Sequence, residues 1–169
     1  MIEKKLIKNA RKNPNKIIFI ANDEKITYSE FLNYVFYFSN LLKKKIKKNS
    51  KVLLIQKSSI EWAIHYFSIR FAGLTPIITS DVVPEYKIKS IIHENKIRYV
   101  ISKKKLRFKN LIFIKNIKRK KIKINIPISF KKKISGNEII YTSGTSGTPK
   151  GVILRLEMSY GIAKMINGI

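Results

Sequence analysis

The chain has 169 residues, no cysteine and a formal net charge of +26, from 36 lysine and arginine residues against 10 aspartate and glutamate. The length fits one domain, the 44% hydrophobic content excludes a disordered composition, and the lack of cysteine excludes disulfides and thiolate metal sites. No apolar run approaches the about 18 residues that span a bilayer, and the N-terminus lacks the apolar core of a secretion signal, so we expect a cytoplasmic protein.

The positive charge is compatible with binding to nucleic acid or to an anionic membrane. Lysine, however, outnumbers arginine 30 to 6, and isoleucine outnumbers valine in the same way. Both excesses follow from A/T-rich codons. Arginine, which reads bases and phosphates through paired hydrogen bonds, is scarce. We therefore expect salt-sensitive adhesion to polyanions, and we expect any binding of nucleic acid to be nonspecific.

The first part of the chain predicts a short helix followed by a β-hairpin. Residues 2–12 are apolar on one side, and an Asn-Pro-Asn turn ends that segment. β-branched residues over 16–20 indicate a strand, 22–25 form a turn, and residues 26–28 begin a return strand. The elements are local, so each can be predicted from its own residues.

A capping box then begins a second helix. The Thr27 side chain can accept a hydrogen bond from the first turn, while Glu30 reaches back to the backbone. The helix ends in lysines 43–45, where cations suit the negative end of the helix dipole. The stripe expected to face the core has helical spacing and consists of Phe31, Val35, Phe38 and Leu42.

From residue 51 onward, strands and helices alternate. Such alternation is typical of a parallel sheet with right-handed crossovers, so the sequence predicts an α/β fold. Ser58 or Ser59 can cap the first helix of this series, and Gly73 ends it. The predicted strands are 51–56, 75–79 and 98–102, and the helix between the last two runs from Pro84 to about Asn95.

Residues 103–135 are dominated by lysine runs, which we interpret as solvated loops. Strands are expected at 110–114 and 122–128. The two histidines are interpreted as structural: His65 on the polar edge of its helix beside Glu61, and His93 at a helix end. The acidic residues are scattered and show no acid/base or metal-ligand spacing, so we predict no catalytic residue and no metal ligand in this chain.

The most informative stretch is Y-T-S-G-T-S-G-T-P-K-G-V at residues 141–152, preceded by an apolar, strand-like run. Glycine lets backbone N–H groups approach a ligand closely, and successive N–H groups form a concave anion-binding nest. The hydroxyl side chains add donors. Lys150 adds a full charge, and a hydrogen bond to a charged group contributes about 1.5–3 kcal/mol. The stretch therefore predicts a site for a polyphosphate.

This stretch differs from a Walker A loop. Pro149 occupies the position of the last glycine, and an apolar run at 151–154 follows where that loop would open a helix. We therefore predict a loop that joins two strands, with no helix dipole directed at the phosphate. A plain glycine-serine turn in a hairpin is the alternative. Twelve consecutive residues that fit favour phosphate binding.

Residues 141–152 resemble the phosphate-binding signature of the adenylate-forming superfamily, the AMP-dependent synthetases and ligases that include acyl-CoA synthetases. Residues 26–31 and 72–76 resemble two earlier markers of that family. Its members join a carboxylate to ATP, release pyrophosphate, and usually pass the acyl group to a thiol such as coenzyme A. By this resemblance, the ATP phosphates would be bound by Thr142, Ser143, Gly144, Thr145, Ser146, Gly147, Thr148 and Lys150.

The resemblance implies that residues 1–169 are a truncated N-terminal domain, with a β-hairpin and helix followed by strand/helix units on a largely parallel sheet. It implies ATP and Mg²⁺ as cofactors, although the family's magnesium and ribose ligands, its hinge and its catalytic lysine have no counterpart here. Leu156 stands where the family often has a histidine. A carboxylate and coenzyme A or a carrier thiol would be partners only if the missing region were supplied.

Three alternatives stay open at this point. The chain is a truncated or remnant ligase that keeps the phosphate loop without turnover, or one half of a split enzyme that a second chain completes. The third alternative is a noncatalytic basic module that binds a nucleotide or nucleic acid. We expect the isolated chain not to form acyl-adenylates, and we expect apolar surface where the missing strands would pack.

Overall fold

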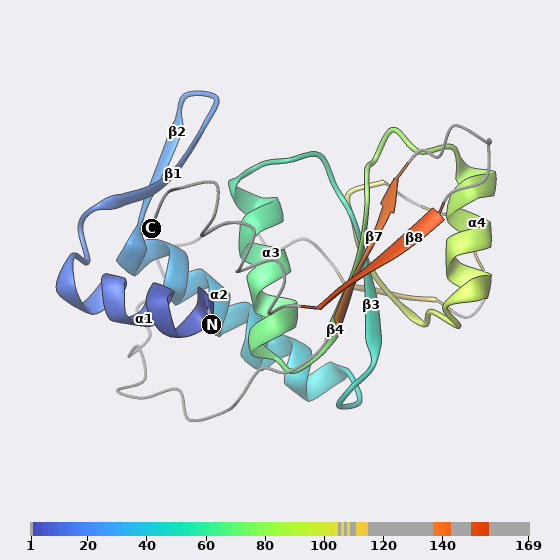
Figure 1. Cartoon of the computed structure of the whole chain (residues 1–169), viewed down its shortest axis with the longest axis horizontal. Helices are drawn as coiled ribbons and strands as arrows, with labels where there is room; N and C mark the ends of the chain where they lie inside the picture. The colour runs from blue at the N-terminus through green and yellow to red at the C-terminus, as the bar shows by residue number, and fades with distance from the viewer. Residues whose placement is uncertain are drawn as a thin grey trace.

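The chain folds into a helical N-terminal part followed by a sheet with helices on both faces (Figure 1). The sheet is largely parallel, so the α/β class expected from the alternation of elements is confirmed. The residues described by this computed structural model are 2–104, 106, 108, 111–114, 137–142 and 150–155.

The N-terminal part contains the predicted helix and hairpin. Asn22 in the hairpin turn has a φ of 53°, in the left-handed region that asparagine tolerates better than most residues. The return strand begins at Glu24, inside the predicted turn, and ends at Thr27 because Thr27 caps the next helix and Tyr28 becomes its first residue. The elements are α1 (Ile2–Lys12), β1 (Ile17–Ala21), β2 (Glu24–Thr27) and α2 (Tyr28–Lys45).

The capping box at the start of α2 is confirmed. The backbone N–H of Glu30 donates to Thr27 Oγ1 at 3.3 Å, and the backbone N–H of Thr27 donates to Glu30 Oε2 at 3.0 Å. These bonds satisfy donors that a helix start otherwise leaves unpaired, and such a cap is worth about 1 kcal/mol. The predicted stripe is also confirmed, since Phe31, Val35, Phe38 and Leu42 are all buried.

Six of the described strands form one sheet, in the order β6-β5-β3-β4-β7-β8. Neighbouring strands are parallel except for β7 and β8, which form an antiparallel hairpin. The predicted strand at 122–128 lies outside the described residues. The elements are β3 (Lys51–Ile55), α3 (Ile60–Phe71), β4 (Thr75–Thr79), α4 (Glu85–Glu94), β5 (Tyr99–Ser102), β6 (Ile112–Ile114), β7 (Asn137–Thr142) and β8 (Lys150–Arg155).

The central strand β3 is buried on both faces because helices cover both sides of the sheet (Figure 1). Alternate side chains of a strand point to opposite faces. Val52 and Leu54 therefore pack in the cluster that contains α3 and the end of α2, whereas Leu53 and Ile55 pack with α4. A separate aromatic cluster joins α1, α2, α3 and the β1–β2 hairpin.

Both ends of α3 follow the sequence prediction. Ser59 is the N-cap, and its Oγ accepts a hydrogen bond from the backbone N–H of Trp62 at 3.1 Å. Gly73 follows the C-cap residue Ala72 and has a φ of 76°, the left-handed conformation that commonly ends a helix. Between these caps α3 is buried over most of its circumference, because it packs against both α2 and the sheet strands β3 and β4.

The outermost strands of the described sheet carry exposed apolar side chains. Ile112 on β6 is 51% exposed, and Val152 and Ile153 on β8 are 45% and 61% exposed. The strand β8 pairs with β7 on one side only within the described residues. Both outer strands of the described sheet therefore present apolar side chains at its surface.

Candidate phosphate-binding hairpin

The predicted phosphate loop connects the two strands of the β7–β8 hairpin. The ladder runs from the Asn137–Arg155 pair to the Thr142–Lys150 pair, so the prediction of a strand-to-strand connection is confirmed. Thr142 and Lys150, the two outer members of the predicted site, are thus directly opposite each other in backbone register. The other predicted site residues, Ser143, Gly144, Thr145, Ser146, Gly147 and Thr148, lie outside the described residues.

The sheet directs this hairpin toward the edge where α/β proteins bind ligands. β7 pairs in parallel with β4, through Ile139 opposite Ile77 and Ile140 opposite Ile78. Because β3, β4, β5 and β7 are all parallel, Thr142 ends β7 at the carboxyl edge of the sheet. In open α/β sheets, ligands bind outside the carboxyl ends of the strands. The fold therefore places the start of the predicted loop at this edge.

The tyrosine just before the loop is fixed by two hydrogen bonds to the end of α4. Tyr141 Oη accepts a hydrogen bond from Asn95 Nδ2 at 2.7 Å and donates one to Glu94 Oε2 at 2.8 Å. Burial raises the pKa of Tyr141, and the hydrogen bond to Glu94 adds to that shift. The phenol therefore keeps its proton and can act as the donor to Glu94. These two bonds attach β7 to the C-terminal end of α4, which packs on one face of the sheet.

Gly151 is required by packing inside the hairpin. It stands opposite Tyr141, and a Cβ at this position would be 2.9 Å from Tyr141 Cζ and 3.2 Å from Ile139 Cγ2. The ring cannot easily move away, because its hydroxyl is held by Glu94 and Asn95. Sequence reasoning attributed the glycines of this stretch to phosphate contact. For Gly151 the structure shows a different reason for the glycine: the neighbouring side chains of Tyr141 and Ile139 leave no room for a Cβ.

A buried ionic network supports the other end of β7. Arg70 of α3 contacts the Glu3 carboxylate of α1, and its Nη1 donates to Tyr66 Oη at 2.6 Å. The same Nη1 is 3.9 Å from Glu138 Oε2 of β7, and Tyr66 Oη donates to that carboxylate. Glu3, Arg70 and Glu138 are 0%, 4% and 4% exposed. The network thus connects α1 and α3 to the strand that leads into the loop.

Sequence reasoning missed this network, because its members are far apart in the chain and only one arginine marks it. The signal that was available is Arg70 itself, an ionisable residue within a helix that is apolar over most of its surface. Arginine is almost never fully buried without a partner. Burial raises the pKa of Tyr66 well above its ordinary value, so its hydroxyl remains protonated within the network.

The prediction that His65 lies on the polar edge of α3 is wrong. Its side chain is buried, because α3 packs against α2 on the side that carries His65, and its ring meets Phe38 edge-on at 5.0 Å. His65 Nδ1 is 2.9 Å from Gln56 Oε1. Burial lowers its pKa from 6.5 to about 4, Glu61 opposes that shift and Lys103 adds to it. His65 is therefore neutral at physiological pH.

The described residues contain no group of three or more histidine, aspartate or glutamate side chains that lie together as a metal would require. We assign no step to a metal. No helix in the described part of the chain has both the length and the apolar character needed to cross a membrane.

With this geometry in hand, comparison with known proteins decides the family. A family model described as AMP-binding enzyme matches residues 6–160. The chain belongs to the AMP-binding enzyme family. The resemblance inferred from residues 141–152 is thereby confirmed. A comparison with curated protein sequences gives no significant match.

Solved structures of AMP-binding enzymes share this fold. The N-terminal subdomain of Klebsiella oxytoca NpsA, in complex with 3-hydroxybenzoyl-AMSN, is 19% identical with a TM-score of 0.70, over 90% of this chain and 40% of that one. O-succinylbenzoate coenzyme A synthetase (MenE) from Bacillus subtilis, in complex with AMP, is 16% identical with a TM-score of 0.72. The match covers 97% of this chain and 46% of MenE. At this identity the likeness concerns the fold, and the chain spans less than half the length of either structure.

Proposed function

We propose that this chain is the N-terminal part of an adenylate-forming ligase and that its β7–β8 hairpin presents residues 143–149 to the phosphates of ATP. One observation carries the proposal. Thr142 and Lys150 form the last pair of a hairpin that ends at the carboxyl edge of a parallel sheet, in a chain of the AMP-binding enzyme family. A loop at that edge, rich in glycine and hydroxyl groups, is suited to an anion.

In the proposed reaction a carboxylate oxygen of the substrate attacks the α-phosphorus of ATP. The bond to the bridging oxygen breaks, and pyrophosphate leaves with the electron pair. The loop would bind the phosphates that leave, through its backbone N–H groups, its hydroxyls and the ammonium group of Lys150. The related MenE structures hold AMP or the acyl-adenylate intermediate OSB-AMP, which are a product fragment and the intermediate of such chemistry.

We propose further that residues 1–169 bind ATP without turning it over. The rate of adenylation depends on groups aimed at the charge that develops on the α-phosphate. The chain covers only 40% and 46% of the two structures compared above, which supports the view that part of that machinery comes from elsewhere. The remaining contacts to ribose, magnesium and the carboxylate would come from further residues of the same protein or from a second chain.

The first experiment measures ATP binding by the chain. Lys150→Ala should weaken ATP binding by about tenfold, because a charge-assisted hydrogen bond of about 1.5 kcal/mol is lost. Lys48→Ala removes the same charge from an exposed position just before β3 and serves as the matched control. Equal weakening by both variants would show diffuse attraction to a basic chain, and unchanged binding in Lys150→Ala would remove Lys150 from the site.

The second experiment measures pyrophosphate release from ATP in the presence of a panel of carboxylates. The chain alone should give no release above the blank. Release well above the blank, dependent on one of the carboxylates, would show that residues 1–169 suffice for adenylation and would overturn that part of the proposal.

A further inference from the structure

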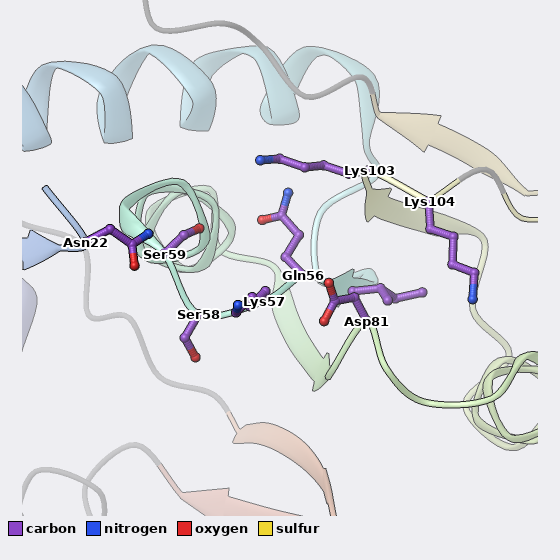
Figure 2. Close-up of a pocket in the computed structure, with 9 residues that line it drawn as sticks. Asn22, Gln56, Lys57, Ser58, Ser59, Asp81, Lys103 and Lys104 are labelled. Atoms are coloured by element: carbon purple, nitrogen blue, oxygen red, sulfur yellow. The ribbon is translucent and has the colours of Figure 1, made fainter. Parts of the chain in front are cut away.

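A cavity lies at the carboxyl edge of the sheet, beside the ends of β3 and β5. The strands β3 and β5 are neighbours in the sheet. The strand that follows β3 in the chain, β4, lies on the side of β3 away from β5, and the strand that follows β5, β6, lies on the side of β5 away from β3. The carboxyl ends of β3 and β5 therefore form the switch point of the sheet, where ligands of open α/β folds bind. A cavity of about 490 Å³ opens here, lined by residues that directly follow β3 and β5 (Figure 2).

Gln56 provides a buried donor in the wall of this cavity. It follows β3, is 6% exposed, and lines the cavity with its side chain (Figure 2). Its Oε1 is 2.9 Å from His65 Nδ1, whereas its Nε2 has no hydrogen-bond partner among the described residues. A buried amide donor without an acceptor is unfavourable, so a ligand that accepts its hydrogen bond would relieve that cost.

The contact with His65 fixes the orientation of the Gln56 amide. Neutral histidine can donate from Nδ1, and the Gln56 oxygen is then the acceptor. The amide nitrogen is consequently turned away from His65. Because α3 buries His65 and excludes water there, this arrangement is built into the core and does not depend on a mobile surface side chain.

The other lining residues favour an anion. Lys103 and Lys104 follow β5, Lys57 follows Gln56, and Ser58 and Ser59 lead into the N-terminus of α3, which carries a partial positive charge. Asp81 is the single acidic residue of the lining, and Ser80 Oγ donates to its Oδ1 at 3.4 Å. Three ammonium groups against one carboxylate leave the cavity with an excess of positive charge and of donors.

We propose that this switch-point cavity binds a phosphate group, with the Gln56 amide, Lys103 and the N-terminus of α3 as its donors. The ionised oxygens of a phosphate accept hydrogen bonds, and its negative charge suits a lining with a net positive charge. The donors named here come from β3, β5 and α3, whereas the strand that leads into the predicted loop is β7, which β4 separates from β3. The proposal therefore does not rest on the function of the loop.

The test is a nitrogen-15 NMR titration of the full chain at an ionic strength of about 0.15 M, where the Debye length is about 8 Å. One arm uses inorganic phosphate and a second uses adenosine 5′-diphosphate. The Gln56 side-chain amide signal should shift saturably. Gln56→Glu keeps the acceptor for His65 and replaces the donor with a carboxylate oxygen, and should weaken binding at least about tenfold. Lys103→Gln should weaken it about threefold or more, and the exposed control Lys48→Gln less than about twofold.

Each outcome decides the proposal. Saturable binding that depends on Gln56 and Lys103 supports it; tighter binding of the diphosphate then identifies a nucleotide as the ligand, and equal binding identifies free phosphate. A Gln56 signal that does not move would overturn the proposal. It would also be overturned if Lys48→Gln weakened binding as much as Lys103→Gln does, or if Lys150→Ala abolished binding whereas the Gln56 and Lys103 variants did not. Thermal melting shows whether Gln56→Glu is folded, and Gln56→Asn, which withdraws the amide by one methylene, gives the same test should Gln56→Glu unfold.

Discussion

Replacing Arg70 with methionine should destabilise the fold and loosen the strand that leads into the phosphate loop. The guanidinium contacts the fully buried Glu3, hydrogen-bonds Tyr66 Oη at 2.6 Å and faces Glu138 at 3.9 Å. Removing one partner of a buried ion pair costs about 3–5 kcal/mol, because the other charge remains desolvated. For a chain of this length that loss lowers Tm by roughly 10 °C.

Urea unfolding followed by circular dichroism measures the effect. Arg98→Met is the matched control, because Arg98 is exposed, and its unfolding free energy should stay within about 0.5 kcal/mol of the parent. The double variant Glu3→Leu/Arg70→Met removes both charges, so it should recover part of the loss. An Arg70→Met chain within about 1 kcal/mol of the parent would refute the reasoning, since the network would then contribute little to the attachment of β7.

Two further substitutions test the surroundings of the hairpin and of the cavity. Gly151→Ala should lower the free energy of unfolding by about 1–3 kcal/mol, because its Cβ would displace the Tyr141 ring from Glu94 and Asn95; in a Tyr141→Ala background the same change should cost far less, and an equal cost would exclude the ring as its cause. The folded-state pKa of His65 is about 4 against 6.5 when unfolded, so the unfolded chain binds the extra proton between these values and stability should fall by about 3 kcal/mol as the pH drops from 6.5 to 4. His65→Gln should flatten the curve of unfolding free energy against pH between pH 6.5 and 4. An unaltered slope there would show that other groups cause the loss of stability.

Local signals predicted much of the fold. The capping box at Thr27, the cap at Ser59 and the left-handed Gly73 each depend on a few adjacent residues, so the sequence was sufficient to find them. The parallel sheet followed from the alternation of strands and helices, because such connections have one favoured handedness. The strand-to-strand nature of the β7–β8 connection followed from Pro149 and the apolar run after it.

Long-range packing explains what the sequence did not reveal. His65 was misplaced because a helix that is apolar nearly all round gives no indication of which polar residue is also enclosed. Glu3, Arg70 and Glu138 meet only once α1, α3 and β7 are assembled, and no spacing in the chain links them. The switch-point cavity likewise depends on the order of strands in the sheet, which places the residues after β3 and β5 side by side.

The most direct measurement is an ATP titration of the isotopically labelled chain, read at the backbone amides of Gly144 and Gly147. If these glycines line a polyphosphate site, their signals should shift saturably, and Lys150→Ala should move the midpoint to about tenfold higher ATP. Signals that stay in place while ATP is bound elsewhere, or that drift in step with all other amides, would contradict phosphate binding by this hairpin.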